Sequence, residues 1–303
     1  MRFGSSKLGR VSVTVRGFDI ERDDDLVYEF LVSTFNFDSM NSYLLPAYWA
    51  YGLLHPFFKP ELSNLIGLWE SDGELVGVAT YEWYPGEAQL HVHSDFTYLL
   101  PDMLRYAEQH LSSTDDGVKE LAIWITDAET EKRQMLQSSG YTLTQTEVVQ
   151  LYDLTKPFPR VALPPGFRVI TGAEIDSERL AKFWWEAFEN TEDMPDRQRD
   201  WVARWRTSRH SNPELLTAIV APDGEYACGL GMWVDQANRF AYLEPLATLP
   251  KYRGLGLAAY ALVETMKRAK DLGAVICDGG SNPFYNQLGF TPHLKRERWA
   301  RNE

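Results

Sequence analysis

Cysteine is scarce in this sequence, which contains only two in 303 residues. Cys228 and Cys277 lie 49 positions apart, and both fall in stretches predicted to be strands. Small secreted domains stabilised by disulfides carry a much higher density of cysteine, so this pair indicates buried, reduced thiols and a cytoplasmic setting. The spacing matches no metal-binding pattern either, and we assign the two cysteines no chemistry.

A long hydrophobic run is also absent. Residues 39–58 carry no charge, but asparagine, histidine and two prolines interrupt them. A membrane helix needs about 20 mostly apolar residues. At the N-terminus, Arg2, Lys7 and Arg10 are not followed by an apolar segment. We therefore expect neither a membrane span nor a signal peptide.

Positive charge is in deficit, with 43 acidic and 30 basic residues and a formal net charge of −13. The deficit lies in the first half: residues 1–155 contain 24 acidic and 10 basic residues, whereas residues 156–303 contain 19 and 20. An acidic surface disfavours nucleic acid and favours cationic small molecules, and it also promotes solubility. We expect neither a nucleic-acid partner nor a membrane partner.

The chain is long enough for two domains, each with its own core. Residues 156–165 contain four prolines, which is typical of a semi-rigid linker. Predicted strands and helices follow the same order in residues 1–155 and in residues 166–303. This repetition predicts two tandem domains of the same α/β class.

The richest stretch of the sequence is residues 242–290. It is predicted to contain a strand, a glycine-rich turn, a long helix, a second strand and a short aromatic helix. In the turn, small residues at Gly254, Gly256 and Ala258 allow backbone N–H groups to approach a ligand closely. The positive end of the following helix and the guanidinium of Arg253 favour an anion at the same place. The turn is therefore predicted to bind a pyrophosphate.

A dinucleotide-binding fingerprint fits the same turn. The spacing Gly254-x-Gly256-x-x-Ala259 matches, and Asp278 follows at about the distance of a ribose-binding acid. Against this interpretation, no glycine follows the strand directly, and only 49 residues remain after Gly254. That is too few to complete a doubly wound sheet.

Two motifs resemble those of the GCN5-related N-acetyltransferase (GNAT) family. Arg253-Gly-Leu-Gly256-Leu-Ala258 is similar to the R/Q-x-x-G-x-G/A loop that holds the pyrophosphate of coenzyme A. Tyr285-Asn-Gln-Leu-Gly-Phe290 is similar to the later Y-x-x-x-G-F motif, and one helix and one strand separate the two. The resemblance implies two tandem GNAT-like domains, each a mixed, mainly antiparallel sheet flanked by helices. It also implies acetyl-CoA as co-substrate, no metal, and direct attack by a primary amine of a small cationic acceptor.

The resemblance further implies roles for particular residues. Glu244, before the loop, is the candidate base, with a structural carboxylate as the alternative. Tyr285 corresponds to the general acid that protonates the leaving thiolate, with a packed aromatic as the alternative. The implied cofactor contacts are Leu246, Ala247, Thr248, Arg253, Gly254, Leu255, Gly256, Leu257, Ala258, Asn282 and Phe284.

Acceptor binding in this family falls on the first two helices and the loop between them. Trp184, Trp185 and Glu189 occupy that part of the second half, where aromatic walls and a carboxylate suit a cation. A solvated helix end is the alternative interpretation. Six aromatic residues within 43–58 are a further candidate lining, although packing between the domains is the favoured interpretation.

The first half lacks both motifs that the second half carries. Residues 93–102 replace the phosphate loop without glycine or arginine and with two aspartates, and Leu136 takes the place of Tyr285. We expect this half not to bind coenzyme A and to have a structural or acceptor-shaping role. His91, His93 and Asp95 alternate along a strand, but no fourth metal ligand accompanies them. A rival to the enzyme is a non-catalytic acyl-CoA sensor or scaffold, as a monomer or homodimer in either case.

Overall fold

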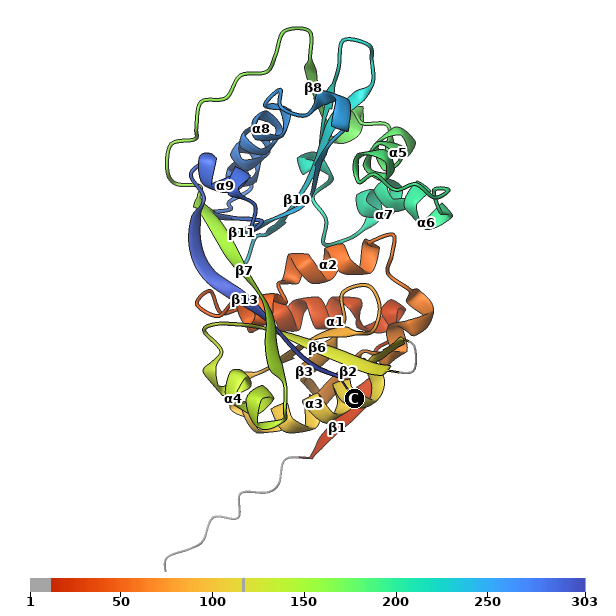
Figure 1. Cartoon of the computed structure of the whole chain (residues 1–303), viewed down its shortest axis with the longest axis vertical. Helices are drawn as coiled ribbons and strands as arrows, with labels where there is room; N and C mark the ends of the chain where they lie inside the picture. Colours follow the sequence, from red (N-terminus) through yellow and green to blue (C-terminus); the bar gives the residue numbers. More distant parts are fainter. Residues whose placement is uncertain (1–11, 116–117, 303) are drawn as a thin grey trace, which may run out of the picture.

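The computed structural model describes residues 12–115 and 118–302; the N-terminal segment examined for a signal peptide lies outside them. One thirteen-stranded sheet runs through these residues, in the order β1-β2-β3-β4-β6-β13-β7-β12-β11-β10-β9-β8, with β5 beside β6. Figure 1 shows helices on both sides of this sheet, with the first half of the chain below and the second above. The predicted α/β fold with a mixed sheet is confirmed.

The first half contributes seven strands and four α-helices. They are β1 (Val13–Gly17), α1 (Ile20–Ser33), α2 (Pro46–Leu54), β2 (Gly67–Ser71), β3 (Glu74–Thr80), β4 (Glu87–Val92), α3 (Leu100–His110), β5 (Ser113–Asp115), β6 (Val118–Thr126), α4 (Thr130–Ser138) and β7 (Thr142–Asp153). Two short 3₁₀ segments bear on the argument below, η1 (Met40–Tyr43) and η3 (Ser94–Leu99).

The second half follows a similar order of elements, but three α-helices and not two follow its first strand, and its long helix leads to the next strand without a counterpart of β5 in the described residues. Its elements are β8 (Arg168–Thr171), α5 (Ser177–Ala187), α6 (Asp196–Arg199), α7 (Trp201–Thr207), β9 (Thr217–Val220), β10 (Tyr226–Asp235), β11 (Phe240–Thr248), α8 (Leu257–Asp271), β12 (Ile276–Gly279), α9 (Pro283–Gln287) and β13 (Thr291–Asn302). No helix of the described residues combines the length and the apolar character that crossing a membrane demands.

Each half contains one parallel strand pair that separates after two paired positions. In the first half Glu87 and Ala88 of β4 pair with β6. In the second half Phe240 and Ala241 of β11 pair with β12. The other strand pairs are antiparallel. Beyond these positions the two strands of each parallel pair are no longer hydrogen-bonded to each other, and we call this separation the opening of each half.

The last strands of the two halves are interleaved. β13, at the end of the chain, lies between β6 and β7 of the first half, and β7 in turn pairs with β12 of the second. The register of β13 with β6 extends from Arg296 opposite Thr126 to Asn302 opposite Glu120. Both strands are long and connect the two parts of the molecule in Figure 1. The sheet is therefore continuous across the predicted boundary at residues 156–165, which itself stays a prediction.

The uncharged aromatic stretch forms the contact between the halves. Most of α2 is buried, because it packs under β10 and β11 as well as on α1. The ring of Tyr51 lies 6.1 Å from Trp233 and 6.2 Å from Trp201, both in the second half. A helix buried on all sides needs apolar residues on every face, which explains why this stretch carries no charge.

Candidate functional site

The predicted pyrophosphate loop joins β11 to α8. Gly254 and Gly256 both have left-handed backbone conformations, with φ of +78° and +77°, which only glycine adopts without cost. A Cβ at either position would meet no heavy atom within 4 Å, so both backbones face open space. In the described residues, the N–H groups of residues 254–259 donate to no other group. The loop therefore offers a row of free donors at a helix start, as an anion requires.

Arg253 lies beside this row and is about half exposed. Its Nε donates to the carbonyl of Thr248 at 3.1 Å, and one terminal nitrogen donates to the carbonyl of Ala187 at 3.3 Å. The other terminal nitrogen forms an ion pair with Glu189 at 2.9 Å. Glu189, predicted to contact the acceptor, thus lies against the arginine of the phosphate loop.

The strand before the loop has one free edge. Among residues 12–115 and 118–302, Leu246, Ala247 and Thr248 pair only with β10 on one side, because the pairing of β11 with β12 ends at Ala241. Free backbone donors and acceptors on this edge can bind an extended amide-bearing chain as an added strand would. The predicted cofactor contacts from Leu246 to Ala258 therefore form one continuous stretch along the opening and the loop.

Glu244 occupies a bulge of β11, where the register with β10 shifts. Its carbonyl accepts a hydrogen bond of 3.0 Å from the indole of Trp233, which fixes the bulge. Burial, together with the nearby carboxylates of Glu82 and Asp278, raises the pKa of Glu244 to about 8, against a smaller opposing effect of Arg296. A carboxyl with a pKa near neutrality is suited to exchange protons with a substrate.

Tyr285 lies in the first turn of α9, on the other side of the opening. The side chain of Asn282 caps this helix by accepting the N–H of Phe284 at 2.9 Å. The Tyr285 ring packs against Phe284 and Phe290, with centroids 5.2 and 5.4 Å away. Burial, followed by the charges of Glu244 and Asp278, raises the pKa of Tyr285 well above its usual value. The phenol therefore keeps its proton at neutral pH.

The structure adds a buried acid that sequence reasoning considered only for a ribose. Asp278, at the diverging end of β12, accepts a hydrogen bond from the hydroxyl of Tyr43 in the first half. Its other carboxylate oxygen is buried without a partner in the described residues. Burial raises the pKa of Asp278 to about 7, and hydrogen bonding with Tyr43 and the charge of Arg296 oppose this rise.

Arg296 of β13 is a cation whose charge acts on Glu244 and Asp278, and it also forms an ion pair with Glu147 at 3.6 Å. Its guanidinium lies 4.4 Å from the centre of the Tyr43 ring and 4.5 Å from that of Trp124. It lowers the pKa of Glu82, although burial prevails and raises that pKa to about 7. Three carboxyls and one arginine thus share a small buried region, which leaves an excess of negative potential when the carboxyls ionise.

Tyrosines of the first half form the wall opposite β11. The rings of Tyr43, Tyr48 and Tyr51 lie 6.4, 6.0 and 6.1 Å from that of Tyr242. In the sequence, only the aromatic stretch within residues 43–58 hinted at this wall. The contacts with Tyr242 join residues almost 200 positions apart, and no local pattern reveals them. The candidate site is therefore built by both halves of the chain.

The predicted acceptor residues of α5 lie in different surroundings. Trp184 is fully buried and packs with Trp201 and Trp205 at centroid distances of 4.8 and 6.0 Å. Its side chain thus packs in the core of the second half, and its predicted contact with an acceptor stays a prediction. Trp185 is half-buried, its indole donates to the carbonyl of Glu192, and its ring lies 6.4 Å from Phe57.

The corresponding segment of the first half differs. After β4 the chain forms η3 and then α3, which has Pro101 in its first turn and no side-chain cap. Asp95 and Asp102 are exposed there. Across residues 12–115 and 118–302, no cluster of three or more histidine, cysteine or acidic side chains is arranged to hold a metal.

Residues 177–290 match the model of the acetyltransferase (GNAT) family. This segment runs from α5 to α9 and includes the loop, Glu244 and Tyr285. No curated protein sequence is a significant match to the chain.

Solved structures with the same fold span nearly the whole chain. A tandem GNAT protein from the clavulanic acid biosynthesis pathway is 14% identical, with a TM-score of 0.66, and the match covers 96% of this chain and 98% of that one. A GCN5-related N-acetyltransferase from Sphaerobacter thermophilus is 17% identical, with a TM-score of 0.60 and coverage of 96% and 95%. The N-myristoyltransferase of Saccharomyces cerevisiae, solved with bound myristoyl-CoA, is 12% identical, with a TM-score of 0.55 and coverage of 98% and 80%.

Proposed function

Because this chain carries a GNAT-family acetyltransferase domain over residues 177–290, we propose that it transfers the acetyl group of acetyl-CoA to a primary amine of a small, cationic acceptor. The observation that carries the proposal is the alignment of three features along one opening. These are the free N–H groups of the loop, the free edge of β11, and the pair formed by Glu244 and Tyr285 on either side.

The loop and the strand edge would hold the co-substrate. The N–H groups of residues 254–259 and the guanidinium of Arg253 suit the pyrophosphate. The edge at Leu246 and Thr248 suits the amides of the pantetheine arm. Asn282 and Phe284, at the start of α9, border the same opening. Binding of the pyrophosphate would compete with Glu189 for Arg253, since the two anions use the same guanidinium.

The reaction needs three proton movements. Glu244 would remove one proton from the bound ammonium group, directly or through a water, and the free amine would then attack the carbonyl carbon of the thioester. A C–N bond forms, the C–S bond breaks, and the sulfur leaves as a thiolate. The O–H of Tyr285 would then protonate the thiolate, and the Tyr285 phenolate would take up the second proton of the attacking nitrogen, directly or through a water. The products are the acetylated amine, coenzyme A and the proton on Glu244, which passes to solvent.

The acceptor class follows from the surroundings of Glu244. Glu82 and Asp278 are acidic, Arg296 is the opposing cation, and tyrosine rings form the opposite wall. Carboxyls and aromatic faces both favour a cation. The first half would thus shape the acceptor site without binding the co-substrate itself, and Trp185 and Glu189 remain candidate contacts at its outer end.

A second candidate is a non-catalytic acyl-CoA sensor. The observation that favours it is the ion pair of Arg253 with Glu189, which a bound pyrophosphate would break. Such a contact can report binding by releasing the segment after α5. The enzyme and the sensor share the loop, and they differ in whether Glu244 and Tyr285 turn over substrate.

Thermal unfolding with acetyl-CoA, coenzyme A or NAD tests the shared part of the proposal. A ligand at about 100 times its dissociation constant adds roughly 2.7 kcal/mol, which raises the unfolding midpoint measurably. We expect stabilisation by the first two compounds and not by NAD; stabilisation by NAD alone would favour the dinucleotide interpretation instead. Thiol release with a panel of polyamines and amino sugars then separates the enzyme from the sensor. Turnover of none of these amines by a protein that binds acetyl-CoA would favour the sensor.

A further inference from the structure

A second cavity lies in the first half of the chain, outside the site described above. Its volume is about 540 Å³, and its lining comes from the end of α1, η1, β4, η3 and the start of α4. A cavity of this size is within the range of small-molecule sites. Its floor contains buried polar side chains, among them His91, Asn41 and Lys132.

The cavity lies between the end of β4 and the turn that leads from β6 into α4, and the candidate active site lies at the corresponding place between β11 and β12. His91 is three residues beyond Ala88, the last residue of β4 that pairs with β6. Glu244 is likewise three residues beyond Ala241, the last residue of β11 that pairs with β12. In the repeated architecture, His91 therefore stands where the second half has its candidate base.

The hydrogen bonds of Thr34 fix which nitrogen of His91 carries the proton. The Thr34 hydroxyl donates its single hydrogen to the carbonyl of Phe30 at 2.6 Å. In its 2.7 Å contact with Nε2 of His91, the hydroxyl oxygen must then accept, so Nε2 carries a hydrogen. Burial, with the nearby Lys132 and His93, lowers the pKa of His91 to about 3, and the ring is neutral.

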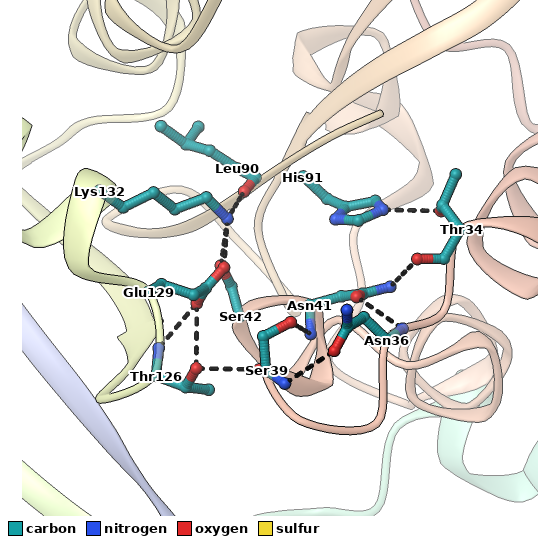
Figure 2. A network of polar contacts seen from close by, with 10 residues as sticks. All are labelled: Thr34, Asn36, Ser39, Asn41, Ser42, Leu90, His91, Thr126, Glu129 and Lys132. Carbon is teal, nitrogen blue, oxygen red and sulfur yellow. Dashed lines mark hydrogen bonds and ion pairs between the residues drawn. The ribbon is translucent and has the colours of Figure 1, made fainter. Parts of the chain in front are cut away.

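It follows that Nδ1 of His91 is an unprotonated acceptor. This nitrogen lies on the side of the ring away from Thr34 (Figure 2). It has no hydrogen-bond partner among residues 12–115 and 118–302. The ring is also packed at 5.3 Å from Phe30, which holds its orientation.

The two charged side chains of the cavity floor, Lys132 and Glu129, form an ion pair with each other. Nζ of Lys132 donates to Ser42, to the carbonyl of Leu90 and to Glu129 at 2.6, 2.7 and 2.6 Å, so all three of its hydrogens are used. Glu129 also accepts from the hydroxyl of Ser42 and from the backbone N–H of Thr126, whose hydroxyl donates to the carbonyl of Ser39 at 2.8 Å (Figure 2). The side chains of Lys132 and Glu129 are only about a tenth exposed. This network leaves the Lys132 ammonium group without a free hydrogen for a phosphate, and His93, which also lines the cavity, lies 3.9 Å from the Asp95 carboxylate.

Donors lie at the mouth of the cavity. The side-chain oxygen of Asn36 accepts the N–H groups of Asp38 and Ser39 at 2.9 and 3.1 Å, which orients the amide. Its NH₂ group donates to nothing within the described part of the chain. Asn36 is exposed, so this group is accessible to a ligand.

We propose that this cavity is a second ligand site, which takes a small, uncharged, hydroxyl-bearing molecule without a phosphate. A hydroxyl of the ligand donates to Nδ1 of His91, and an oxygen of the ligand accepts from the amide of Asn36. The Lys132–Glu129 pair forms the closed floor. The site is independent of acetyl-CoA binding in the second half.

Nitrogen NMR of protein labelled with ¹⁵N-histidine tests this proposal, because the Nδ1 resonance of His91 moves when that atom accepts a hydrogen bond. The probes are two matched pairs, glycerol with glycerol 3-phosphate and glucose with glucose 6-phosphate. We expect at least one neutral probe to shift the resonance saturably, and its phosphate to bind at least tenfold more weakly. No saturable shift with either neutral probe, or equal binding of the phosphates, would overturn the proposal.

Asn36→Ala supplies the matched variant, because the residue is exposed and the substitution removes its NH₂ donor, together with the two hydrogen bonds that its oxygen accepts from Asp38 and Ser39. We expect the dissociation constant of the neutral probe to rise several-fold. Gln109→Ala removes an exposed amide of the same half that does not line the cavity, and it is expected to leave binding unchanged. Equal affinity in Asn36→Ala and in the unchanged protein would refute the assigned contact. Acetyl-CoA binding is the check that both variants are folded.

Discussion

Glu244 is a carboxyl that is mostly protonated at pH 7, since its pKa is raised to about 8. A base must be ionised to accept a proton, so the rate of acetyl transfer should rise with pH up to about 8 and then level off. Glu244→Gln should lower kcat by about 10²- to 10⁴-fold, the usual contribution of a general base, and should abolish this rise.

Steady-state kinetics from pH 6 to 9 measures this effect. Glu186→Gln is the control, because that glutamate is exposed on α5, and its profile should match that of the unchanged protein. A Glu244→Gln variant that keeps both the rate and the pH profile would show that Glu244 is a structural carboxylate.

The ionisation of Asp278, in the same buried region as Glu244, should make the free energy of unfolding depend on pH. Its pKa is raised from 3.8 to about 7 in the folded protein, so between these values the folded state binds more protons than the unfolded state. The free energy of unfolding therefore decreases as the pH rises from 4 through 7. In Asp278→Asn this decrease should be smaller, while an amide oxygen can still accept the Tyr43 hydroxyl.

Urea unfolding at pH 5 and pH 8 measures the difference. The loss of stability between the two pH values should be reduced in the variant, and its midpoint should exceed that of the unchanged protein increasingly toward alkaline pH, where only the unchanged protein carries the buried charge. An identical loss in the two proteins would mean that Asp278 is already ionised at pH 5.

At the scale of elements, substitutions at the two ends of α8 can distinguish the effect of the loop on acetyl-CoA binding from the effect of the helix. Gly256 and Gly273 stand at opposite ends of α8, both at positive φ and both with open space where a Cβ would lie. Alanine at either position should cost about 1–2 kcal/mol of stability, because a Cβ strains this conformation. Only Gly256→Ala should also weaken acetyl-CoA binding, by about tenfold for each 1.4 kcal/mol of lost interaction.

Calorimetric titration of the two variants with acetyl-CoA makes the comparison. Gly273→Ala is matched in backbone cost and lies a whole helix away from the loop. If both variants lose the same affinity, the effect comes from α8 as a whole and the loop is not the anion site.

Elements with strong local signals could be predicted from the sequence, and those defined by distant contacts could not. The glycine turn and α8 follow from residues within one stretch, as does the position of Tyr285. By contrast, β13 carries charged residues along most of its length and was not predicted, because its strand character comes from pairing with β6 and β7.

The candidate site likewise combines residues that the sequence predicts with residues that only distant contacts bring together. Glu244 and the loop are close in sequence, whereas the hydroxyl of Tyr43 reaches Asp278 across 235 positions. No local pattern encodes such a contact. Trp184 shows a different ambiguity, since an aromatic residue on a helix gives the same sequence signal whether it faces a ligand or packs, as Trp184 does, against other tryptophans.

At the scale of the whole molecule, the interleaved strands make the two halves depend on each other. A chain cut at residue 160 gives one fragment that ends with β7 and another that contains β12 and β13. Each fragment alone exposes strand edges that are paired in the intact protein, which favours aggregation. We expect the fragments to be insoluble when expressed separately and to assemble one-to-one when expressed together.

Size-exclusion chromatography with light scattering tests the expectation. A folded, monomeric fragment 1–160 would contradict it, and would show that β6 and β7 close on each other without β13. The same experiment tests the predicted domain boundary at residues 156–165. A fragment that ends there and folds alone would support this boundary, although the sheet of the intact protein continues across it.

The position of β13 also determines when the first half can be completed as the protein is made. Residues 12–153 leave the ribosome long before residues 291–302, yet β6 and β7 pair with that last strand. During synthesis of the whole second half, the gap between β6 and β7 has no native occupant. A nascent chain of this design needs either a chaperone or a temporary pairing at that gap until its final residues emerge.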